Sequence, residues 1–472
     1  MNLKKSLRKH NGFTTLLCTA ILLLLFPGFV RTVFYEKIPG GTMNYRDVIL
    51  ASRIDYKEFN KNSVTQSIAI KPYYALLHLM LKFLSPNFLM NFLAPLFGLL
   101  FLLFLYLILR KLEIEREILF IAMLMLILSS SFIWNFTVLN ENSFILFILA
   151  LGIFLFLTEN KVSSVLGFLI LIMISFGNLI ASIVGYSLLI LFLFYRSSMF
   201  AYKAEKRKRI IFMISSIFLI LTILNIYLIK ERILNENKEI LTYFSEITMS
   251  NGFGMIIVIL ALTGFLTIGN ERKLLKNIFL IALLLLVLFG LNFIVYANIV
   301  FCISAAYGFI WIINRKWELK NLNYWSVLLI ICGILLMALS IDLKIASQRP
   351  DLKDFDALNS LKALRKGVVL SHEDYGFWIE YFSAKETLIN NLNNFAKEDI
   401  ANIFYGYNFS LSMDLIKKYK ISYVFITPEM KSGLVWKKDD EGLLFLMKNS
   451  NRFNRIYNKN DYEIWEVLDE QG

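Results

Sequence analysis

The sequence predicts an α-helical polytopic membrane protein with about eleven transmembrane helices and a small soluble α/β domain at its C-terminal end. Hydrophobic residues make up 57% of the 472 residues, and the mean hydropathy is +0.60, well above that of an ordinary soluble protein. Long apolar runs recur up to residue 341, whereas residues 342–472 have short apolar runs and charges of both signs. We therefore expect a transmembrane domain at 1–341 and a separate soluble domain at 342–472.

Each predicted span is an apolar run long enough to cross a hydrocarbon core about 30 Å thick as a helix, which satisfies its own backbone hydrogen bonds. The runs occupy residues 13–30, 88–109, 118–135, 143–157, 163–177, 178–195, 210–229, 254–269, 276–292, 296–314 and 324–341. The run at 13–30 follows a basic N-terminus and precedes no small-residue cleavage site, so it is interpreted as an anchor.

The distribution of Lys and Arg predicts a cell-membrane protein with a cytoplasmic N-terminus, because basic residues near span ends are retained in the cytoplasm. In that orientation the inner segments carry the whole net charge of +13, including the basic run at 206–209, and the outer segments cancel to zero. The basic character is thus a topology signal and does not indicate a nucleic-acid partner. The long first outer loop, 31–87, and the soluble domain are expected outside the cytoplasm.

The content of the apolar runs disfavours cysteine-based sites and ion-coupled transport. Cys18, Cys302 and Cys332 all lie in such runs, so we expect no structural disulfide and no thiolate metal site. No ionisable residue lies well inside a predicted span, which disfavours an ion-coupled transporter. Passive transport or lipid flipping remains compatible with the sequence.

The two long outer segments contain the remaining predicted elements. In the first outer loop, residues 72–84 have an apolar face typical of a helix on the membrane surface. In the soluble domain, helix-like stretches at 355–366 and 411–420 alternate with short strand candidates at 367–370, 423–427 and 462–467. This alternation predicts a layered α/β structure.

Residues 374–379 read DYGFWI and stand near the start of the soluble domain. This motif is similar to the second half of the WWDYGYWI signature of oligosaccharyltransferase catalytic subunits, which belong to the GT-C superfamily of membrane glycosyltransferases. His372 and Glu373 stand where that family has its two tryptophans. Because those tryptophans and the aspartate read a glycosylation sequon in the family, their absence argues against protein N-glycosylation. The resemblance implies that Asp374 and Tyr375 bind another acceptor.

Three further pieces resemble acid-bearing loops of the same family. YRDVILASRIDY is similar to the first-loop stretch in which an aspartate contributes to a divalent-metal site; Asp47 takes that position, and Asp55 is a second candidate. The second outer loop, where the family has an acidic pair, contains only Glu141 here. YFSE falls where the family has a short motif ending in glutamate, which implies Glu246 as a substrate-binding residue.

The resemblance implies transfer of a sugar from a polyprenyl-phosphate-linked donor to an unknown acceptor at the outer face of the membrane. The leaving group is anionic, and a divalent cation, Mg²⁺ or Mn²⁺, held by oxygen ligands would stabilise its charge. Asp47 and Glu141 are the predicted catalytic and metal-binding residues, with Asp55 as a further metal ligand. One of the two carboxylates would also deprotonate the acceptor.

Four basic residues near the outer interface are candidates for binding the carrier phosphate, and the sequence does not choose among them. They are Arg46, Arg53, Lys71 and Arg232.

Other interpretations of these residues stay open. Asp47 is also consistent with a solvated loop residue, Glu141 with an acid that favours a helix N-terminus, and Asp374 with a helix N-cap beside core aromatic residues. At the level of the whole chain, one alternative is a non-catalytic GT-C relative that acts as a lipid-carrier binding or scaffold subunit. Another is a flippase for lipid-linked sugars.

Overall fold

The structure, a computed structural model, describes most of the chain in two compact units. The described residues are 12–34, 39–53, 71–158, 160–175, 254–268, 273–289, 293–318, 320–389, 397–438 and 440–468, with isolated positions between 183 and 187. The helical unit comprises Met1–Val30 and Ile54–Ala346, and the sheet unit comprises Arg31–Arg53 and Ser347–Gly472. Each unit is described by itself below.

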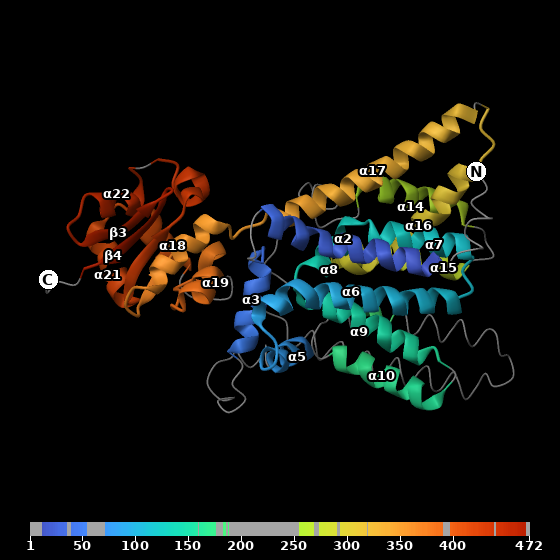
Figure 1. The fold of residues 1–472 in the computed structure, drawn as a ribbon, viewed down its shortest axis with the longest axis horizontal. Helices are drawn as coiled ribbons and strands as arrows, with labels where there is room; N and C mark the ends of the chain where they lie inside the picture. Colours follow the sequence, from blue (N-terminus) through green and yellow to red (C-terminus); the bar gives the residue numbers. More distant parts are fainter. Residues whose placement is uncertain are drawn as a thin grey trace. The chain divides into compact units, whose positions relative to one another are not determined.

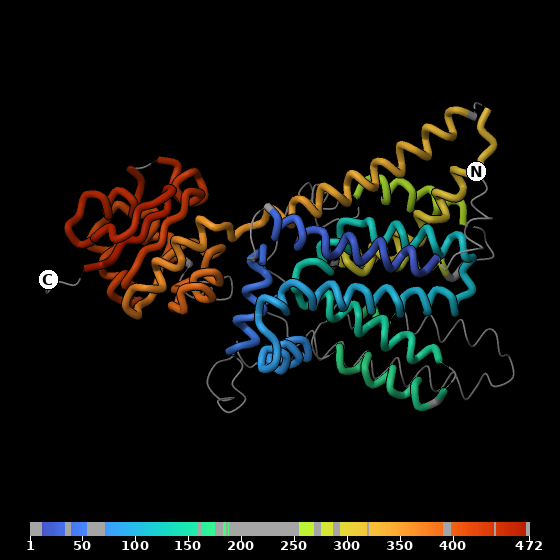
Figure 2. Tube along the Cα trace, in the orientation of Figure 1, coloured from blue at the N-terminus to red at the C-terminus, as the bar shows by residue number. Residues whose placement is uncertain are grey.

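The described part of the helical unit consists of α-helices, several of which run side by side (Figures 1 and 2). The helices are α2 (Gly12–Phe34, whose last turn belongs to the sheet unit), α5 (Pro72–Leu81), α6 (Pro86–Lys111), α7 (Arg116–Ile127), α8 (Ser130–Thr137), α9 (Glu141–Phe156), α10 (Lys161–Ser175), α14 (Met255–Thr267), α15 (Lys273–Phe289), α16 (Ile294–Asn314) and α17 (Lys320–Ala346). The predicted apolar runs outside residues 178–253 are thus mostly helical in their described residues, with one break at Leu128 and Ser129.

Four of these helices, α2, α6, α16 and α17, are long and apolar enough to cross a membrane. The pair α7 and α8 passes the same test jointly, so the described residues contain four or five spans by length and composition. The helices α9, α10, α14 and α15 are apolar but shorter. The expected total of about eleven spans is therefore not reached in the described residues. The predicted spans at 178–195 and 210–229 lie almost wholly outside them.

The predicted span 118–135 is broken, because its chain bends by 60° between α7 and α8. Ser129 stands at the break, where its hydroxyl accepts the Phe132 N–H as the N-cap of α8 and donates to the Leu126 carbonyl. Asn298 of α16 donates to the same hydroxyl over 2.7 Å. The side chain of a neighbouring helix thus supports a bend that apolar run length does not reveal.

Two glycines let α14 and α16 approach each other closely. A Cβ atom on Gly264 would lie 1.8 Å from the Ser304 carbonyl oxygen, and one on Gly308 would lie 2.2 Å from the Leu260 carbonyl oxygen. Ser304 also donates its hydroxyl to the Ala261 carbonyl over 2.8 Å. Small residues at such contacts are the usual means by which helices pack in membranes.

The helix α17 extends beyond residue 341, where the sequence predicts the end of the transmembrane domain. It continues to Ala346, so the expected division between residues 341 and 342 falls inside it. Asp342 is fully buried, and neither carboxylate oxygen has a hydrogen-bond partner among the described residues. An ionisable residue therefore lies within the last turns of this candidate span.

The sheet unit contains a four-stranded sheet with the order β1-β2-β4-β3. The strands are β1 (Val368–Leu370), β2 (Ile421–Ile426), β3 (Phe453–Lys459) and β4 (Tyr462–Val467). The pair β1 and β2 is parallel, and the other pairs are antiparallel. The hairpin between β3 and β4 turns at Asn460 and Asp461, both with positive φ, as tight hairpin turns require.

Short helices accompany the sheet. They are α3 (Thr42–Ser52), α18 (Leu352–Lys362), the 3₁₀ turn η4 (Glu373–Tyr375), α19 (Gly376–Trp378), the π-helix η5 (Ile379–Ser383), α20 (Lys397–Tyr405), α21 (Phe409–Lys418), the π-helical turn η6 (Met430–Leu434) and α22 (Gly442–Lys448). Asp351 and Asp354 form a capping box that begins α18. The unit is therefore mixed α/β, as the sequence predicts.

Candidate functional site

Glu141 is the first residue of α9 and is oriented by the asparagine before it. The Asn140 side chain accepts the Ser143 N–H over 3.0 Å. Its amide donates to the main-chain carbonyls of Asn135 (3.0 Å) and Val138 (2.6 Å). These bonds close the turn between α8 and α9. A carboxylate is favourable at this helix N-terminus because the unpaired N–H groups there carry partial positive charge.

Lys71 is a basic partner of Glu141. Its ammonium lies 2.6 Å from Glu141 Oε2, and the two side chains are 25% and 17% exposed. Lys71 also stands 5.9 Å from the centroid of the Tyr74 ring and precedes Pro72, the first residue of α5. The helix predicted at 72–84 is present as α5 over Pro72–Leu81, and the side chain of its N-cap residue, Lys71, reaches the predicted acid.

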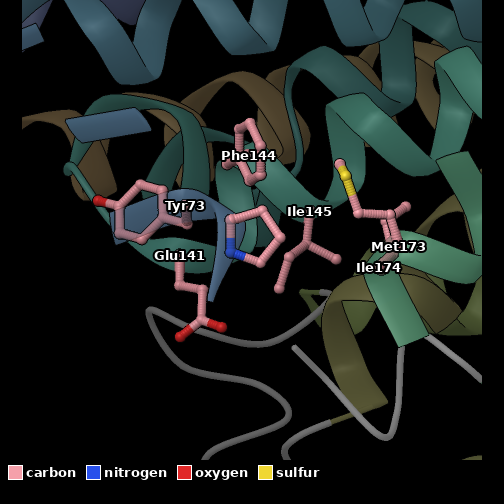
Figure 3. Close-up of a pocket in the computed structure, with 7 residues that line it drawn as sticks. Tyr73, Glu141, Phe144, Ile145, Met173 and Ile174 are labelled. Carbon is pink, nitrogen blue, oxygen red and sulfur yellow. The ribbon is translucent and has the colours of Figure 1, made fainter. Parts of the chain in front are cut away.

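A small apolar pocket adjoins this ion pair (Figure 3). Besides Glu141, the lining residues come from α5, α9 and α10, and they are Pro72, Tyr73, Phe144, Ile145, Met173 and Ile174. The cavity volume is about 10 Å³, which is room for about one water molecule. In Figure 3 the Glu141 carboxylate points away from Phe144 and Ile145. The pocket is therefore lined by apolar residues, and the carboxylate points away from them.

Asp47 lies on α3 in the sheet unit and is fully buried. Its Oδ1 accepts from Nε of Arg46 over 2.9 Å, and Arg46 is 26% exposed. Asp47 is therefore not a solvated loop residue. Like Glu141, it has a basic partner.

Contacts with the segment that follows DYGFWI hold α3 in place. The Tyr45 ring packs against the rings of Tyr381 and Phe382, with centroids 5.0 and 5.2 Å away. At the end of α3, Arg53 lies 3.0 Å from Oε2 of Glu380, a carboxylate that is only 5% exposed. Arg53, one of the phosphate-binding candidates, thus forms an ion pair with a buried acid.

The DYGFWI segment folds as a turn followed by one helical turn, and its members differ in exposure. Asp374 is 57% exposed, and His372 Nδ1 lies 3.3 Å from its Oδ2. The hydrogen bond to His372 lowers the pKa of the Asp374 carboxyl. Phe377 is fully buried and Trp378 is nearly so; the Trp378 indole nitrogen has no hydrogen-bond partner among the described residues. Asp374 is thus accessible, whereas the aromatic residues belong to the core.

Tyr375 connects this segment to a charged cluster that the sequence did not indicate. Burial raises the pKa of Tyr375 to about 12, so its hydroxyl is neutral and donates to Glu429 Oε2 over 3.2 Å. The Arg349 guanidinium binds the same Glu429 carboxylate and lies 3.6 Å from Asp354 Oδ1. The Tyr462 hydroxyl donates to that oxygen of Asp354 over 2.6 Å. The cluster joins the start of the sheet unit's C-terminal part to β4.

The main chain around Arg349 also binds the first-loop segment of the same unit. The Arg349 carbonyl accepts the Gly41 N–H over 2.7 Å. The Arg31 guanidinium donates to the carbonyls of Gln348 and Pro350. These contacts explain why Arg31–Arg53 groups with residues after 346. In the sequence, the RPDL stretch at 349–352 indicates only that a helix begins at Asp351. The contacts of this stretch with Arg31 and Gly41 could not be predicted, because these residues are more than 300 positions away.

The predicted metal ligands Asp47 and Glu141 have donor atoms that suit a divalent cation, but their negative charges are already balanced by basic side chains. Asp47 and Glu141 offer hard carboxylate oxygens, yet each is paired with a basic residue. The described residues hold no group of three or more His, Cys, Asp or Glu side chains arranged for a metal. Asp55, Glu246 and Arg232 lie outside the described residues. A cation at either carboxylate would therefore require the basic partner to move.

The fold resembles that of solved membrane enzymes, although no family model and no curated protein sequence matches the chain. The oligosaccharyltransferase of Archaeoglobus fulgidus in the apo form superposes with a TM-score of 0.60 at 12% identity, covering 92% of this chain and 73% of that chain. The chain has the fold of an archaeal oligosaccharyltransferase. This similarity supports the GT-C resemblance at the level of fold.

Two further structures of the A. fulgidus enzyme are similar. Archaeal oligosaccharyltransferase AglB in complex with an inhibitory peptide and a dolichol-phosphate gives a TM-score of 0.54 at 13% identity, covering 87% of this chain and 70% of that chain. The complex with zinc and sulfate gives 0.55 at 13% identity, covering 87% and 68%. The shared oligosaccharyltransferase fold extends through both units of the present chain.

Proposed function

We propose that the chain is a membrane glycosyltransferase that moves a sugar from a polyprenyl-phosphate-linked donor to an acceptor on the outer face of the membrane. The observation that carries this proposal is the oligosaccharyltransferase fold over 92% of the chain. A similar structure holds a dolichol-phosphate, so a lipid-phosphate donor is proposed here as well, and the acceptor is left open. The donor sugar is left open.

Glu141 and Asp47 are proposed as the acidic residues of the reaction. Glu141 is at the start of α9, 17% exposed, and its loop is fixed by Asn140. Asp47 is on a helix held by Tyr381 and Phe382. Each carboxylate is a proposed ligand of Mg²⁺ or Mn²⁺, whose positive charge would stabilise the phosphate leaving group. An unpaired carboxylate would also accept the proton of the acceptor.

The acceptor is proposed to differ from a protein sequon. Asp374 is exposed and held by His372, which stands where the related motif has tryptophan. Tyr375, in contrast, is bound to Glu429. We therefore propose that Asp374 contacts the acceptor and that Tyr375 positions the segment.

The proposal is tested by sugar transfer from radiolabelled polyprenyl-phosphate and polyprenyl-pyrophosphate donors with the purified full-length chain. We expect transfer by the wild type, a loss of at least about 100-fold in Glu141→Gln and Asp47→Asn, and no loss in Glu113→Gln, which alters an exposed acid. Unchanged transfer in both variants would remove the proposed roles. Addition and chelation of Mn²⁺ in the same assay test the cation.

A second candidate function is a non-catalytic subunit that binds the lipid carrier. The ion pairs of Asp47 with Arg46 and of Glu141 with Lys71 favour it, because a paired carboxylate is a poor base and a poor metal ligand. Carrier binding without transfer to any acceptor, under conditions where cations are supplied, would support this candidate over the transferase.

A further inference from the structure

We propose that Lys71 binds the carrier phosphate, and that its ion pair with Glu141 makes binding of the phosphate and of a divalent cation depend on each other. This inference rests on the proposed use of a lipid phosphate and names the residue that receives it. It concerns binding, so it can be tested separately from sugar transfer.

The structure distinguishes Lys71 from the other described basic candidates. Arg53 pairs with Glu380, which is 5% exposed, and Arg46 pairs with Asp47, which is fully buried. Withdrawal of either arginine would leave a buried carboxylate without its counter-charge, which is strongly unfavourable. Lys71 and Glu141 are 25% and 17% exposed, so solvent or a ligand reaches both. A lysine ammonium on a flexible stem is also suited to changing partners.

Lys71 is a cation that stands beside apolar side chains. The ammonium lies 2.6 Å from Glu141 Oε2, and the apolar wall formed by Tyr73, Phe144 and Ile145 is directly adjacent (Figure 3). Lys71 caps α5, whose buried residues include Tyr73 and Leu77. The ammonium therefore stands directly beside apolar helix residues, the setting that a lipid phosphate with an apolar chain requires.

Charge balance at the pair leads to mutual dependence. If a phosphate binds Lys71 alone, the ion pair weakens and the Glu141 carboxylate faces another anion. If a divalent cation binds Glu141 alone, the ion pair weakens and the Lys71 ammonium faces another cation. When both bind, each group of the pair exchanges one counter-charge for another. Each ligand should thus raise the affinity for the other, and by linkage the two effects are equal.

The test uses the full-length chain in detergent with farnesyl phosphate as a probe and farnesol as the uncharged control. Calorimetry measures the Kd of farnesyl phosphate with and without Mn²⁺, and the Kd of Mn²⁺ with and without farnesyl phosphate. For the wild type we expect each ligand to improve the other's Kd by about tenfold. Farnesol should show no such coupling.

Two variants separate the members of the pair. Glu141→Gln frees Lys71, so farnesyl phosphate should bind tightly without Mn²⁺ and the coupling should disappear. Lys71→Gln should weaken farnesyl phosphate binding both with and without Mn²⁺. In this variant the Kd of Mn²⁺ should no longer depend on farnesyl phosphate. Lys82→Gln, at the exposed C-cap of the same α5, is the matched control and should retain the coupling.

Several results would overturn the inference. Equal Kd values with and without Mn²⁺ in the wild type, or coupling that persists in Glu141→Gln, would show that the pair does not exchange its partners. Unchanged farnesyl phosphate binding in Lys71→Gln would remove Lys71 as the phosphate ligand. Coupled binding without any sugar transfer would instead sustain this inference while the proposed transferase activity fails.

Discussion

The ring of Tyr45 on α3 lies edge-on against the ring of Tyr381 on the π-helix η5, with the centroids 5.0 Å apart and the planes at 65°. Tyr45 is fully buried, and its hydroxyl donates to the Pro39 carbonyl. This contact joins the helix that contains Asp47 to the continuation of the DYGFWI motif. Two stretches more than 300 residues apart in the sequence therefore form one part of the sheet unit.

The first prediction concerns Tyr45. Tyr45→Ala removes a buried ring with aromatic neighbours and should lower the free energy of unfolding of the sheet unit by about 3–5 kcal/mol. Tyr45→Phe keeps the ring and removes only the hydroxyl, so a loss of about 1 kcal/mol is expected. Limited proteolysis of the full-length chain during heating measures both effects. Equal resistance of Tyr45→Ala and the wild type would contradict the packing role.

The second prediction concerns Arg53 and Glu380. Arg53→Met leaves the buried Glu380 carboxylate without its arginine and should cost about 3 kcal/mol. The double variant Arg53→Met, Glu380→Gln should recover most of that loss, because the neutral amide can still accept the Thr387 hydroxyl that now lies 2.8 Å from Glu380 Oε1.

The same double variant tests the phosphate-binding role that the sequence offered for Arg53. Recovery of both stability and sugar transfer would assign Arg53 to structure. Recovery of stability with transfer still lost would assign it to the substrate, and a double variant as unstable as Arg53→Met would contradict the pairing argument.

Run length and charge predicted much of the helical unit, because the helix positions depend on local hydropathy. The apolar runs at 88–109 and 296–314 correspond to α6 and α16 within a few residues. The bend at Ser129 was not predicted, since it depends on a cap and on Asn298, 169 residues later in the chain. The predicted number of about eleven spans is not reached in the described residues. One reason is that α9, α10, α14 and α15 are shorter than a full crossing of the membrane.

The candidate site was predicted only in part. The sequence identified Asp47 and Glu141 as candidate acids, and the DYGFWI resemblance indicated Asp374 as a candidate for binding the acceptor. It did not identify Lys71 as the partner of Glu141, because that pair joins residues 70 positions apart. The strand β3 was also missed, since its sequence FNRIYNK has few apolar residues and gains its structure from pairing with β4.

The third prediction concerns the contact of α14 with α16. Gly264→Val places side-chain atoms where the Ser304 carbonyl already lies 1.8 Å from a Cβ position, so the two helices must separate. The thermal stability of the chain in detergent should fall by several degrees or the variant should fail to fold. Gly28→Ala on α2, where a Cβ meets nothing within 4 Å, is the matched control and should unfold like the wild type.

The fourth prediction concerns the pH dependence of the hydrogen bond between Tyr462 and Asp354. Burial raises the pKa of the Asp354 carboxyl, and the hydrogen bond from Tyr462 opposes that rise. In Tyr462→Phe the pKa of Asp354 should therefore rise further. An acid whose pKa is raised on folding contributes stability that is lost as the pH increases through the folded pKa. The variant should thus lose more stability than the wild type as the pH rises.

We accordingly expect the free-energy cost of Tyr462→Phe to be small near pH 4 and to grow to about 1–3 kcal/mol near pH 7. Urea unfolding of the sheet unit within the full-length chain, followed at several pH values, measures this difference. Because the comparison is between variant and wild type at each pH, other titrating groups cancel. Tyr405→Phe, at a 56% exposed position, should show no such trend. A cost for Tyr462→Phe that stays constant from pH 4 to pH 7 would mean that the phenol acts through packing alone.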